Sequence, residues 1–275
     1  MQTVDFQLNS APGIINYAVE WKLDEAKAVI CLIHGLGEHC RRYDHMAKFY
    51  AGHGYAMLGI DHAGHGRTKG TKGHATIDGL YNGIRLLLNE ASSRYPGKPI
   101  VLYGHSMGGN LVLNHLFRNK PKVNAVVVTG SWIKLGAEPP KFLEWMGRLL
   151  KTIAPSAGRA SGLDAGLISR NKEVVNTYVN DPLVHDRISF GMGIELLDTG
   201  RWLDLYKGTV SIPLLMMHGA GDQITSPLGT KNLASRLTGD VTHKEWPVLY
   251  HEIHNEDEKG KVFDFTLKWM EERLG

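Results

Sequence analysis

The chain has 275 residues, of which 43% are hydrophobic and 21% are charged, so it can form one large α/β domain with a sizeable buried core. A formal net charge of +3, with no dense run of lysine or arginine, gives no support for nucleic-acid binding. No stretch approaches the roughly 18 uninterrupted apolar residues of a membrane-spanning helix, and the first residues, MQTVDFQLNS, lack the pattern of a secretory signal. Because Cys31 and Cys40 form no disulfide framework, we predict a cytoplasmic protein.

Two runs near residues 3–9 and 14–21 alternate polar and apolar residues. This alternation predicts an antiparallel hairpin at the edge of a sheet. Apolar runs without such alternation follow, which indicates strands buried on both faces, as in a parallel sheet. These runs cover 27–35, 54–66, 98–108, 123–131 and 212–222.

Helical patterns lie between the buried runs, near 43–53, 77–95 and 107–119. A last strand near 241–247 precedes a helix near 257–273. Strands that alternate with helices in this order favour an open, doubly wound sheet. The sequence therefore predicts an α/β fold with a mostly parallel, eight-stranded sheet flanked by helices.

The alternation of strand and helix breaks between Ile133 and Tyr206, where no convincing buried strand is found. We interpret residues 133–206 as a helical cap inserted after the sixth strand, with 1–132 and 207–275 forming the core. Within this cap the segment EPPKFLEWMGRLLKTIAP predicts a helix with one apolar face. That face consists of Phe142, Trp145, Met146, Leu149 and Ile153, while Lys141, Glu144, Arg148 and Lys151 lie elsewhere.

A serine lies between glycines in the segment VLYGHSMGGN, after a buried run and before a helical pattern. Gly104-His105-Ser106-Met107-Gly108 fits G-x-S-x-G, in which small residues let a strand and a helix approach closely around a strained serine. A helix N-terminus at Ser106 would also favour developing negative charge. These features predict that Ser106 is a nucleophile rather than a serine that only caps a helix.

A serine nucleophile needs a general base and an acid that orients the base. In the α/β hydrolases, whose serine motif this segment resembles, the acid and then the histidine follow the serine along the chain. Asp222 lies in the glycine-rich loop after the buried run IPLLMMHG, at the carboxyl end of a strand, where open α/β sheets place their sites. Asp240 precedes a strand, and Asp198 and Asp204 lie in the predicted cap, so we choose Asp222.

Two histidines, His251 and His254, follow the last predicted strand in the segment EWPVLYHEIHNE. Both could reach the same edge of the sheet. His251 comes first after the strand and lies in the loop, whereas His254 lies nearer the final helix. This position favours His251 modestly as the base.

An oxyanion intermediate needs two backbone N–H donors. We expect one from Met107, the residue after the nucleophile. The other is expected from Leu36, in the loop HGLGEHCRRY after the third strand.

The loop DHAGHGRTKG places Asp61, His62 and His65 close together in the sequence. A zinc site needs three or four converging ligands, and none of the usual ligand spacings is present. We therefore expect no metal ion and no other cofactor, and interpret the segment as a glycine-rich loop held by polar contacts.

Several segments together resemble the monoacylglycerol lipase and lysophospholipase-like group of serine α/β hydrolases, from about Val29 to near the C-terminus. These segments are HGLGEHCRRY, DHAGHGRTKG, YGHSMGG, SRNKEVVNTYVNDPL, HGAGDQITSP and YHEIHNE. The resemblance implies that Ser106, Asp222 and His251 are the catalytic triad, and that the amides of Leu36 and Met107 form the oxyanion hole. It also implies that a small pocket for the glycerol hydroxyls is lined by Glu38, Arg42, Tyr178 and His254.

The resemblance implies hydrolysis of a monoacylglycerol to a fatty acid and glycerol through an acyl-enzyme on Ser106. A general carboxylesterase, a lysophospholipase or an acyl transferase would use the same machinery. A phosphoglycerol headgroup, however, would require more positive charge than Arg42 supplies. Outside enzymes, the alternative is a non-catalytic ligand-binding protein on the same scaffold.

The apolar face of the predicted cap helix could line an acyl tunnel, pack onto the protein's own core, or contact a membrane surface peripherally. Residues 134–159 contain five basic and two acidic side chains, which would assist contact with anionic lipid. We favour packing on the core. The expected partner is a small-molecule lipid ester, and no nucleic acid is expected.

Overall fold

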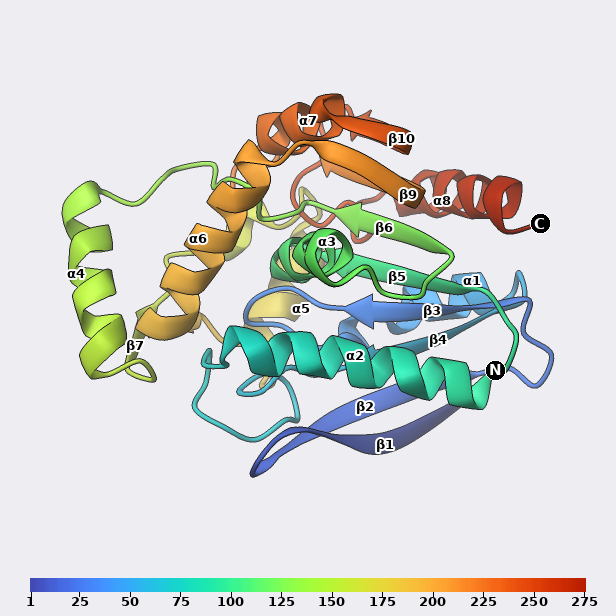
Figure 1. Ribbon diagram of the computed structural model, residues 1–275, viewed down its shortest axis with the longest axis horizontal. Coiled ribbons are helices and arrows are strands. Elements are labelled where there is room, and N and C mark those ends of the chain that lie inside the picture. The colour runs from blue at the N-terminus through green and yellow to red at the C-terminus, as the bar shows by residue number, and fades with distance from the viewer.

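The central sheet has eight strands in the order β1-β2-β4-β3-β5-β6-β9-β10 (Figure 1). The computed structural model describes all residues from 1 to 275. The strands are β1 (Gln2–Ala11), β2 (Ile14–Lys22), β3 (Ala28–Ile33), β4 (Tyr55–Ile60), β5 (Ile100–His105), β6 (Ala125–Thr129), β9 (Gly208–Gly219) and β10 (Leu237–Trp246). β2 pairs antiparallel with β1 and with β4, and all other pairings in this sheet are parallel. The predicted edge hairpin and mostly parallel sheet are confirmed.

Helices cover both faces of this sheet (Figure 1). They are α1 (Asp44–Ala51), α2 (Ile77–Arg94), α3 (Met107–Asn119), α7 (Pro227–Arg236) and α8 (Lys259–Leu274), with the short 3₁₀ helix η1 (Cys40–Tyr43) before α1. A second 3₁₀ helix, η2 (Ala165–Leu167), lies in the chain between β6 and β9. α1 and α8 pack in one hydrophobic layer, and α2, α3 and α7 pack in the other. In β3, Val29, Cys31 and Ile33 join one layer, while Ile30 and Leu32 join the other. Because both faces of the strand are buried, its sequence is apolar without alternation.

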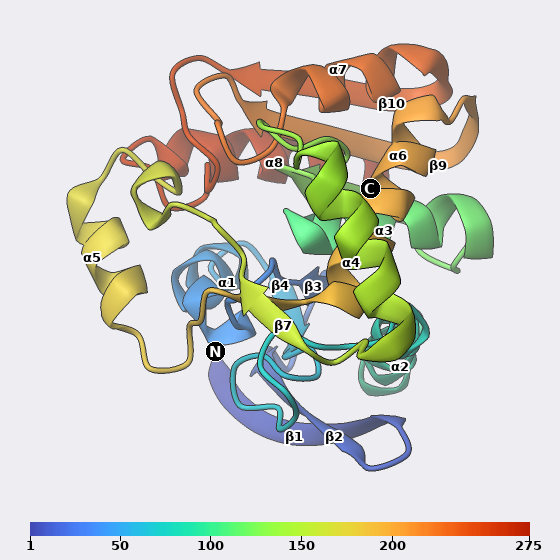
Figure 2. The ribbon, with the colours of Figure 1, turned by 90° about the vertical axis from the view of Figure 1, so that its left-hand side faces the viewer.

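The chain between β6 and β9 lies over the carboxyl ends of the strands, the end that Figure 2 faces. It forms α4 (Lys141–Ile153), β7 (Gly158–Ala160), α5 (Lys172–Asn180), β8 (Arg187–Ser189) and α6 (Phe190–Leu205). The antiparallel pair β7–β8 was not expected, because strands of three residues are too short for a periodic signal. α6 joins the core through Met192, Leu196 and Leu203. A separate cap domain bounded at 133 and 206 therefore stays a prediction.

The apolar face of α4 does not pack on the core, which corrects our expectation. The exposed fractions are 67% for Phe142, 62% for Trp145, 48% for Leu149 and 71% for Ile153. The side toward α6 is centred on Gly147, where a β-carbon would lie 3.1 Å from Ile194 Cδ1. The helix thus presents Gly147 to α6, while Phe142, Trp145, Leu149 and Ile153 of its apolar face lie outward. No helix of the chain, α4 included, combines the length and apolarity needed to cross a membrane.

Candidate active site

Ser106 occupies the turn between β5 and α3, at the carboxyl edge of the sheet. Its backbone has φ 55° and ψ −116°, a strained conformation for a residue with a side chain. A β-carbon at Gly104 would lie 2.5 Å from the Gly108 carbonyl oxygen, and one at Gly108 would lie 2.0 Å from that of Ile33. Only glycine fits both positions, which explains why α3 can begin directly after Ser106 and pack against the end of β3.

The side chains of Ser106, His251 and Asp222 come from three separate loops and form one chain of hydrogen bonds. Ser106 Oγ lies 2.9 Å from His251 Nε2, and His251 Nδ1 lies 2.7 Å from Asp222 Oδ2. All three residues are buried. In the tautomer that suits this geometry, His251 Nδ1–H donates to the carboxylate and Nε2 accepts from the serine hydroxyl. The arrangement has the geometry of a nucleophile, a base and an orienting acid.

The electrostatics of these groups suit the same roles. Burial opposes the charge on Asp222, but the charge on His251 and hydrogen bonds from His218 and His251 outweigh burial and hold the pKa of Asp222 well below its ordinary range. Burial also opposes the charge on His251, yet Asp222 outweighs it and raises the pKa of His251 above its ordinary value. An ionised carboxylate beside the imidazole stabilises the imidazolium that forms when the serine loses its proton.

Asp222 has a second histidine partner that the sequence analysis missed. His218 Nε2 lies 2.9 Å from Asp222 Oδ2, and His218 Nδ1 lies 2.7 Å from the Thr230 hydroxyl oxygen. The amides of Ile224 and Thr225 donate to Asp222 Oδ1 at 2.8 and 3.0 Å. Donors on both oxygens therefore hold the carboxylate in one orientation. The available signal was the histidine that stands four residues before Asp222 in the segment HGAGD.

The amides predicted for the oxyanion hole lie close to Ser106 in the fold. Leu36 and Ser106 line two cavities in common. Met107 follows Ser106 directly and is the first residue of α3. The Leu36 amide has no acceptor within the protein, and the Met107 amide has none in its own helix because it belongs to the first turn. The loop around Leu36 is held by the Gly35 amide, which donates to Glu38 Oε1 at 2.7 Å. Two free N–H groups beside a serine can stabilise an oxyanion.

A small polar cavity of about 10 Å³, which is space for about one water molecule, contains Ser106. Glu38 and Tyr178, which we predicted for the alcohol pocket, line this cavity together with Glu252. Arg42, which we also predicted for the alcohol pocket, does not line this cavity but contacts three residues that do. The Arg42 guanidinium donates one hydrogen bond to Glu38 and two to Glu252, each at 2.7 Å, and lies 4.6 Å from the centre of the Tyr178 ring.

Two carboxylates therefore share one guanidinium at this wall. Burial raises the pKa of Glu38. Burial would also raise the pKa of Glu252, but the charge on Arg42 outweighs it and lowers that pKa to about 2. The cavity consequently presents oxygen acceptors and no unpaired cation, which suits hydroxyl groups better than phosphate. The sequence analysis missed Glu252, although it follows His251 directly and supplies a counter-charge for Arg42.

His254, also predicted for the alcohol pocket, lines neither of the cavities that contain Ser106. It is fully buried, stacked on Tyr43 at 4.7 Å and edge-on to His105 at 4.7 Å between ring centres. Burial lowers the pKa of His254 well below its ordinary value. His105 in turn lies 4.8 Å from the His251 ring. The structure thus places His254 in a stack of rings behind the base, and not at the surface of the cavity.

A larger cavity of about 310 Å³ also contains Ser106, and we call it the catalytic cavity. Its lining is mostly apolar and includes Leu36, Trp132, Leu135 and Ile188. Ligand pockets of about 300–1,000 Å³ with such linings are usual for small molecules. The nucleophile therefore faces an apolar space and a small polar space at once.

The other candidates from the sequence lie away from this site. Asp198 and Asp240 form ion pairs with surface arginines. In the loop after β4, Asp61 accepts hydrogen bonds from the amides of Cys40 and Arg67, each at 2.8 Å. That carboxylate stabilises the turn of its own glycine-rich loop.

The chain is similar to known proteins. The profile of the family described as serine aminopeptidase, S33, matches residues 24–258. An uncharacterized abhydrolase domain-containing protein of Dictyostelium discoideum is 35% identical over 251 residues, which cover 90% of this chain and only 26% of that protein. The monoacylglycerol lipase of Mycolicibacterium smegmatis is 31% identical over 258 residues, which cover 92% of each chain.

The fold is shared with solved structures as well. The crystal structure of the monoacylglycerol lipase of Paleococcus ferrophilus matches with a TM-score of 0.86 at 30% identity, over 93% of this chain and 98% of that one. This similarity confirms the predicted α/β-hydrolase fold. Because the profile covers most of the sequence and a relative matched over 92% of its length is 31% identical, the chain belongs to the serine aminopeptidase S33 family of α/β hydrolases.

Proposed function

We propose that this protein is a serine ester hydrolase that cleaves monoacylglycerols into a fatty acid and glycerol. The observation that carries the proposal is the hydrogen-bonded chain Ser106–His251–Asp222, whose serine belongs to both an apolar cavity and a small polar cavity. A monoacylglycerol has one long apolar end and one small polar end, so it matches this pair of spaces. The similarity to two monoacylglycerol lipases supports the same substrate class.

In the proposed mechanism His251 Nε2 takes the proton from the Ser106 hydroxyl as its oxygen attacks the acyl carbonyl. The amides of Leu36 and Met107 bind the oxyanion, and Asp222 stabilises the imidazolium. His251 then returns the proton to the leaving glycerol oxygen, which releases the alcohol and leaves an acyl-enzyme. Water, activated by the same imidazole, releases the fatty acid.

The polar cavity is proposed to bind the alcohol end of the substrate. Carboxylate oxygens of Glu38 and Glu252 can accept hydrogen bonds from glycerol hydroxyls, and the Tyr178 hydroxyl can donate. Arg42 orients both carboxylates and leaves the wall with one cation for two anions. That balance disfavours the phosphate of a lysophospholipid. His254 is proposed to support this wall from behind through its stacking on Tyr43.

Replacement of Ser106 by alanine tests the proposed chemistry. We expect loss of turnover of monoolein by about 10⁴-fold or more, because removal of a triad member leaves only oxyanion and binding contributions. The matched control is Ser235→Ala, since Ser235 is an exposed serine of α7 with no contact to the site. Wild-type turnover by Ser106→Ala would remove Ser106 from the mechanism.

A substrate panel separates the alternatives. Faster hydrolysis of monoacylglycerols than of lysophosphatidylcholine, simple aryl esters and an aminoacyl anilide supports the proposal. A preference for lysophosphatidylcholine or for simple esters would favour a lysophospholipase or a general carboxylesterase. Failure of Ser106 in folded protein to react with a fluorophosphonate would indicate a binding protein without catalysis.

The outward apolar face of α4 is proposed to contact a membrane surface, where a lipid substrate is presented. Phe142, Trp145 and Ile153 are more than half exposed, and Lys141 and Lys151 lie on the same helix. In this proposal residues 133–206 act as a lid over the catalytic cavity of a cytoplasmic protein. Trp145→Glu should weaken flotation with anionic liposomes, whereas Leu205→Glu, an exposed leucine at the end of α6, should not. Equal flotation of Trp145→Glu and wild type would remove α4 from membrane contact.

A further inference from the structure

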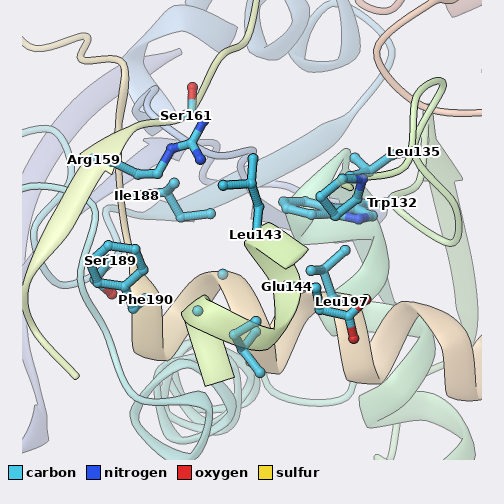
Figure 3. A pocket seen from close by; sticks show the side chains of 14 residues that line it. Trp132, Leu135, Leu143, Glu144, Arg159, Ser161, Ile188, Ser189, Phe190 and Leu197 are labelled. Carbon is cyan, nitrogen blue, oxygen red and sulfur yellow. The ribbon is translucent and has the colours of Figure 1, made fainter. Parts of the chain in front are cut away.

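The cap contacts the rest of the protein in two unlike regions. In the first, Leu143 of α4 lines a mainly apolar cavity between α4 and α6 (Figure 3). The second region is polar. It joins residues 168–171, which we call the SRN segment, to residues 250–258, which we call the base loop because they include His251. The proposed mechanism makes no use of the SRN segment.

A buried carboxylate connects the SRN segment to the backbone directly before His251. Glu256 is fully buried. Its Oε1 accepts from the Tyr250 amide at 2.8 Å and from the Arg170 amide at 3.2 Å, and its Oε2 accepts from Arg170 Nε at 3.2 Å. Arg170 donates to Glu258 as well. Because a buried carboxylate is stable only when a cation and hydrogen-bond donors compensate its charge, Arg170 keeps Glu256 where it holds the Tyr250 amide.

The same segment contacts the backbone directly after His251. The Glu252 amide donates to the Ile168 carbonyl oxygen at 2.8 Å. Further along the base loop, the Asn171 side chain donates to Asp257 Oδ1 at 2.6 Å. The base loop forms no helix or strand, so no regular hydrogen bonding of its own fixes it. The peptide groups on both sides of the base are thus tied to the cap, and this attachment orients the imidazole between them.

The charges around the base give this attachment a measurable sign. The titratable and charged side chains around His251 are Asp222, Glu38, Arg42, Glu252, His105 and His254. Burial lowers the pKa of His251, but the three carboxylates outweigh burial and raise it. The charge of Arg170, acting through space, would lower that pKa, since like charges repel. Its hold on the loop acts in the opposite direction, because it keeps the imidazole against Asp222.

From this geometry we infer that the SRN segment positions the general base, and that Arg170 is the positioning residue, acting through Glu256. Arg170 itself lines neither cavity that contains Ser106. The inference rests on the proposed function for the role of His251 as the base. It gives the cap a part in the chemical step, because the imidazole loses its fixed orientation when residues 168–171 leave the base loop.

The test is Arg170→Met, assayed on the soluble short-chain ester p-nitrophenyl butyrate. A misplacement of about 1 Å can cost about 100-fold in rate, so we expect kcat to fall by about 10- to 100-fold. KM should stay within about twofold of wild type, because the base does not bind the substrate. The matched control is Lys172→Met, since Lys172 is an exposed cation at the start of α5 whose side chain forms no hydrogen bond or ion pair. Its kcat should equal that of wild type.

A second pair of variants separates positioning from the loss of a buried ion pair. Glutamine at position 256 keeps an oxygen for the Tyr250 amide and needs no cation. Arg170→Met combined with Glu256→Gln should therefore recover most of the lost kcat, whereas Arg170→Met combined with Glu256→Leu, which lacks the acceptor, should not. Urea unfolding shows whether each variant is folded. If both double variants are folded and equally slow, the bond to the Tyr250 amide does not position the base and the inference fails.

The pH profile gives the direction of the effect. If the charge of Arg170 acted on His251 through space, Arg170→Met would raise the pKa of His251 and move the acid limb of kcat/KM to higher pH. If Arg170 acts through the loop, the imidazole is held less closely against Asp222, so its pKa falls and the limb moves to lower pH. A limb that stays in place or moves to higher pH overturns the inference.

An NMR titration of the His251 ring separates these outcomes from failure of the proposed function, because it needs no turnover. The ring signal is identified by its absence in His251→Gln. If wild type hydrolyses no ester but the pKa of His251 is lower in Arg170→Met, the positioning role stands and the proposed reaction fails. If wild type hydrolyses the ester and Arg170→Met matches it in kcat and in the pKa of His251, the positioning role fails and the reaction stands.

Discussion

Replacing His218 by leucine tests how the Asp222 carboxylate is held. Asp222 Oδ2 lies 2.7 Å from His251 Nδ1 and 2.9 Å from His218 Nε2, so two ring N–H groups share one oxygen. A hydrogen bond to a charged group contributes about 1.5–3 kcal/mol. Loss of the His218 donor also leaves the Thr230 hydroxyl without its partner. We expect the free energy of unfolding to fall by about 2–4 kcal/mol.

The same substitution should change the pH dependence of catalysis. Without His218, the negative charge of Asp222 acts more strongly on His251, whose pKa is already raised. The reaction needs the neutral imidazole, so the acid limb of kcat/KM should move to higher pH. One pKa unit corresponds to about 1.36 kcal/mol, so a lost hydrogen bond of this strength predicts a shift of roughly one unit. His218→Gln, which keeps an amide N–H, should restore most of the wild-type profile.

The assay is kcat/KM for a soluble short-chain ester from about pH 5 to 8, the range in which histidine titrates. Urea unfolding of each variant gives the loss of stability separately. If His218→Leu keeps the wild-type acid limb, or if His218→Gln behaves like the leucine variant, the hydrogen bond from residue 218 to Asp222 does not set the pKa of His251.

Three further outcomes follow from the site. In wild type, kcat/KM should fall as pH drops through an apparent pKa above the ordinary value of about 6.5, because Asp222 favours the inactive imidazolium of His251; a limb below that value would contradict the electrostatic argument. Gly108→Ala should lower stability by about 3 kcal/mol or more in urea unfolding, since its β-carbon would lie 2.0 Å from the Ile33 carbonyl oxygen. Arg42→Met should lower the free energy of unfolding by about 3–5 kcal/mol, because it leaves the buried carboxylates of Glu38 and Glu252 unpaired. This loss of stability should become smaller in acid, as the two carboxylates bind protons.

The nucleophile could be predicted because its constraints are local. Ser106 needs small residues two positions away on each side, and the reason is visible in the close approach of Gly104 and Gly108 to neighbouring carbonyl oxygens. Asp222 and the pair His251 and His254 could be predicted as candidates because they follow recognisable strands, and the resemblance to known hydrolases favoured His251. Parallel strands bring their carboxyl ends to one edge, so residues far apart in the sequence could be expected to meet there.

The alcohol side of the site was predicted less completely. Glu38 and Tyr178 line the polar cavity as expected, but Glu252 joins them only because the loop after β10 brings it within 2.7 Å of Arg42. His254 stands two residues further along and turns into a buried stack instead. Neighbouring positions in an irregular loop have no fixed period, so the sequence contains no rule for which of them faces a cavity.

What the sequence alone determined was the order of buried strands and helices, the strained serine turn, and the short set of candidates for the acid and the base. These follow from hydrophobic pattern, glycine positions and chain order. Only the tertiary structure decided the orientation of α4, whose amphipathic pattern marks an apolar face but not whether protein or solvent covers it. It also decided the second partner of Asp222 and the burial of His254 in a stack of rings, because both depend on which side chains the fold brings into contact.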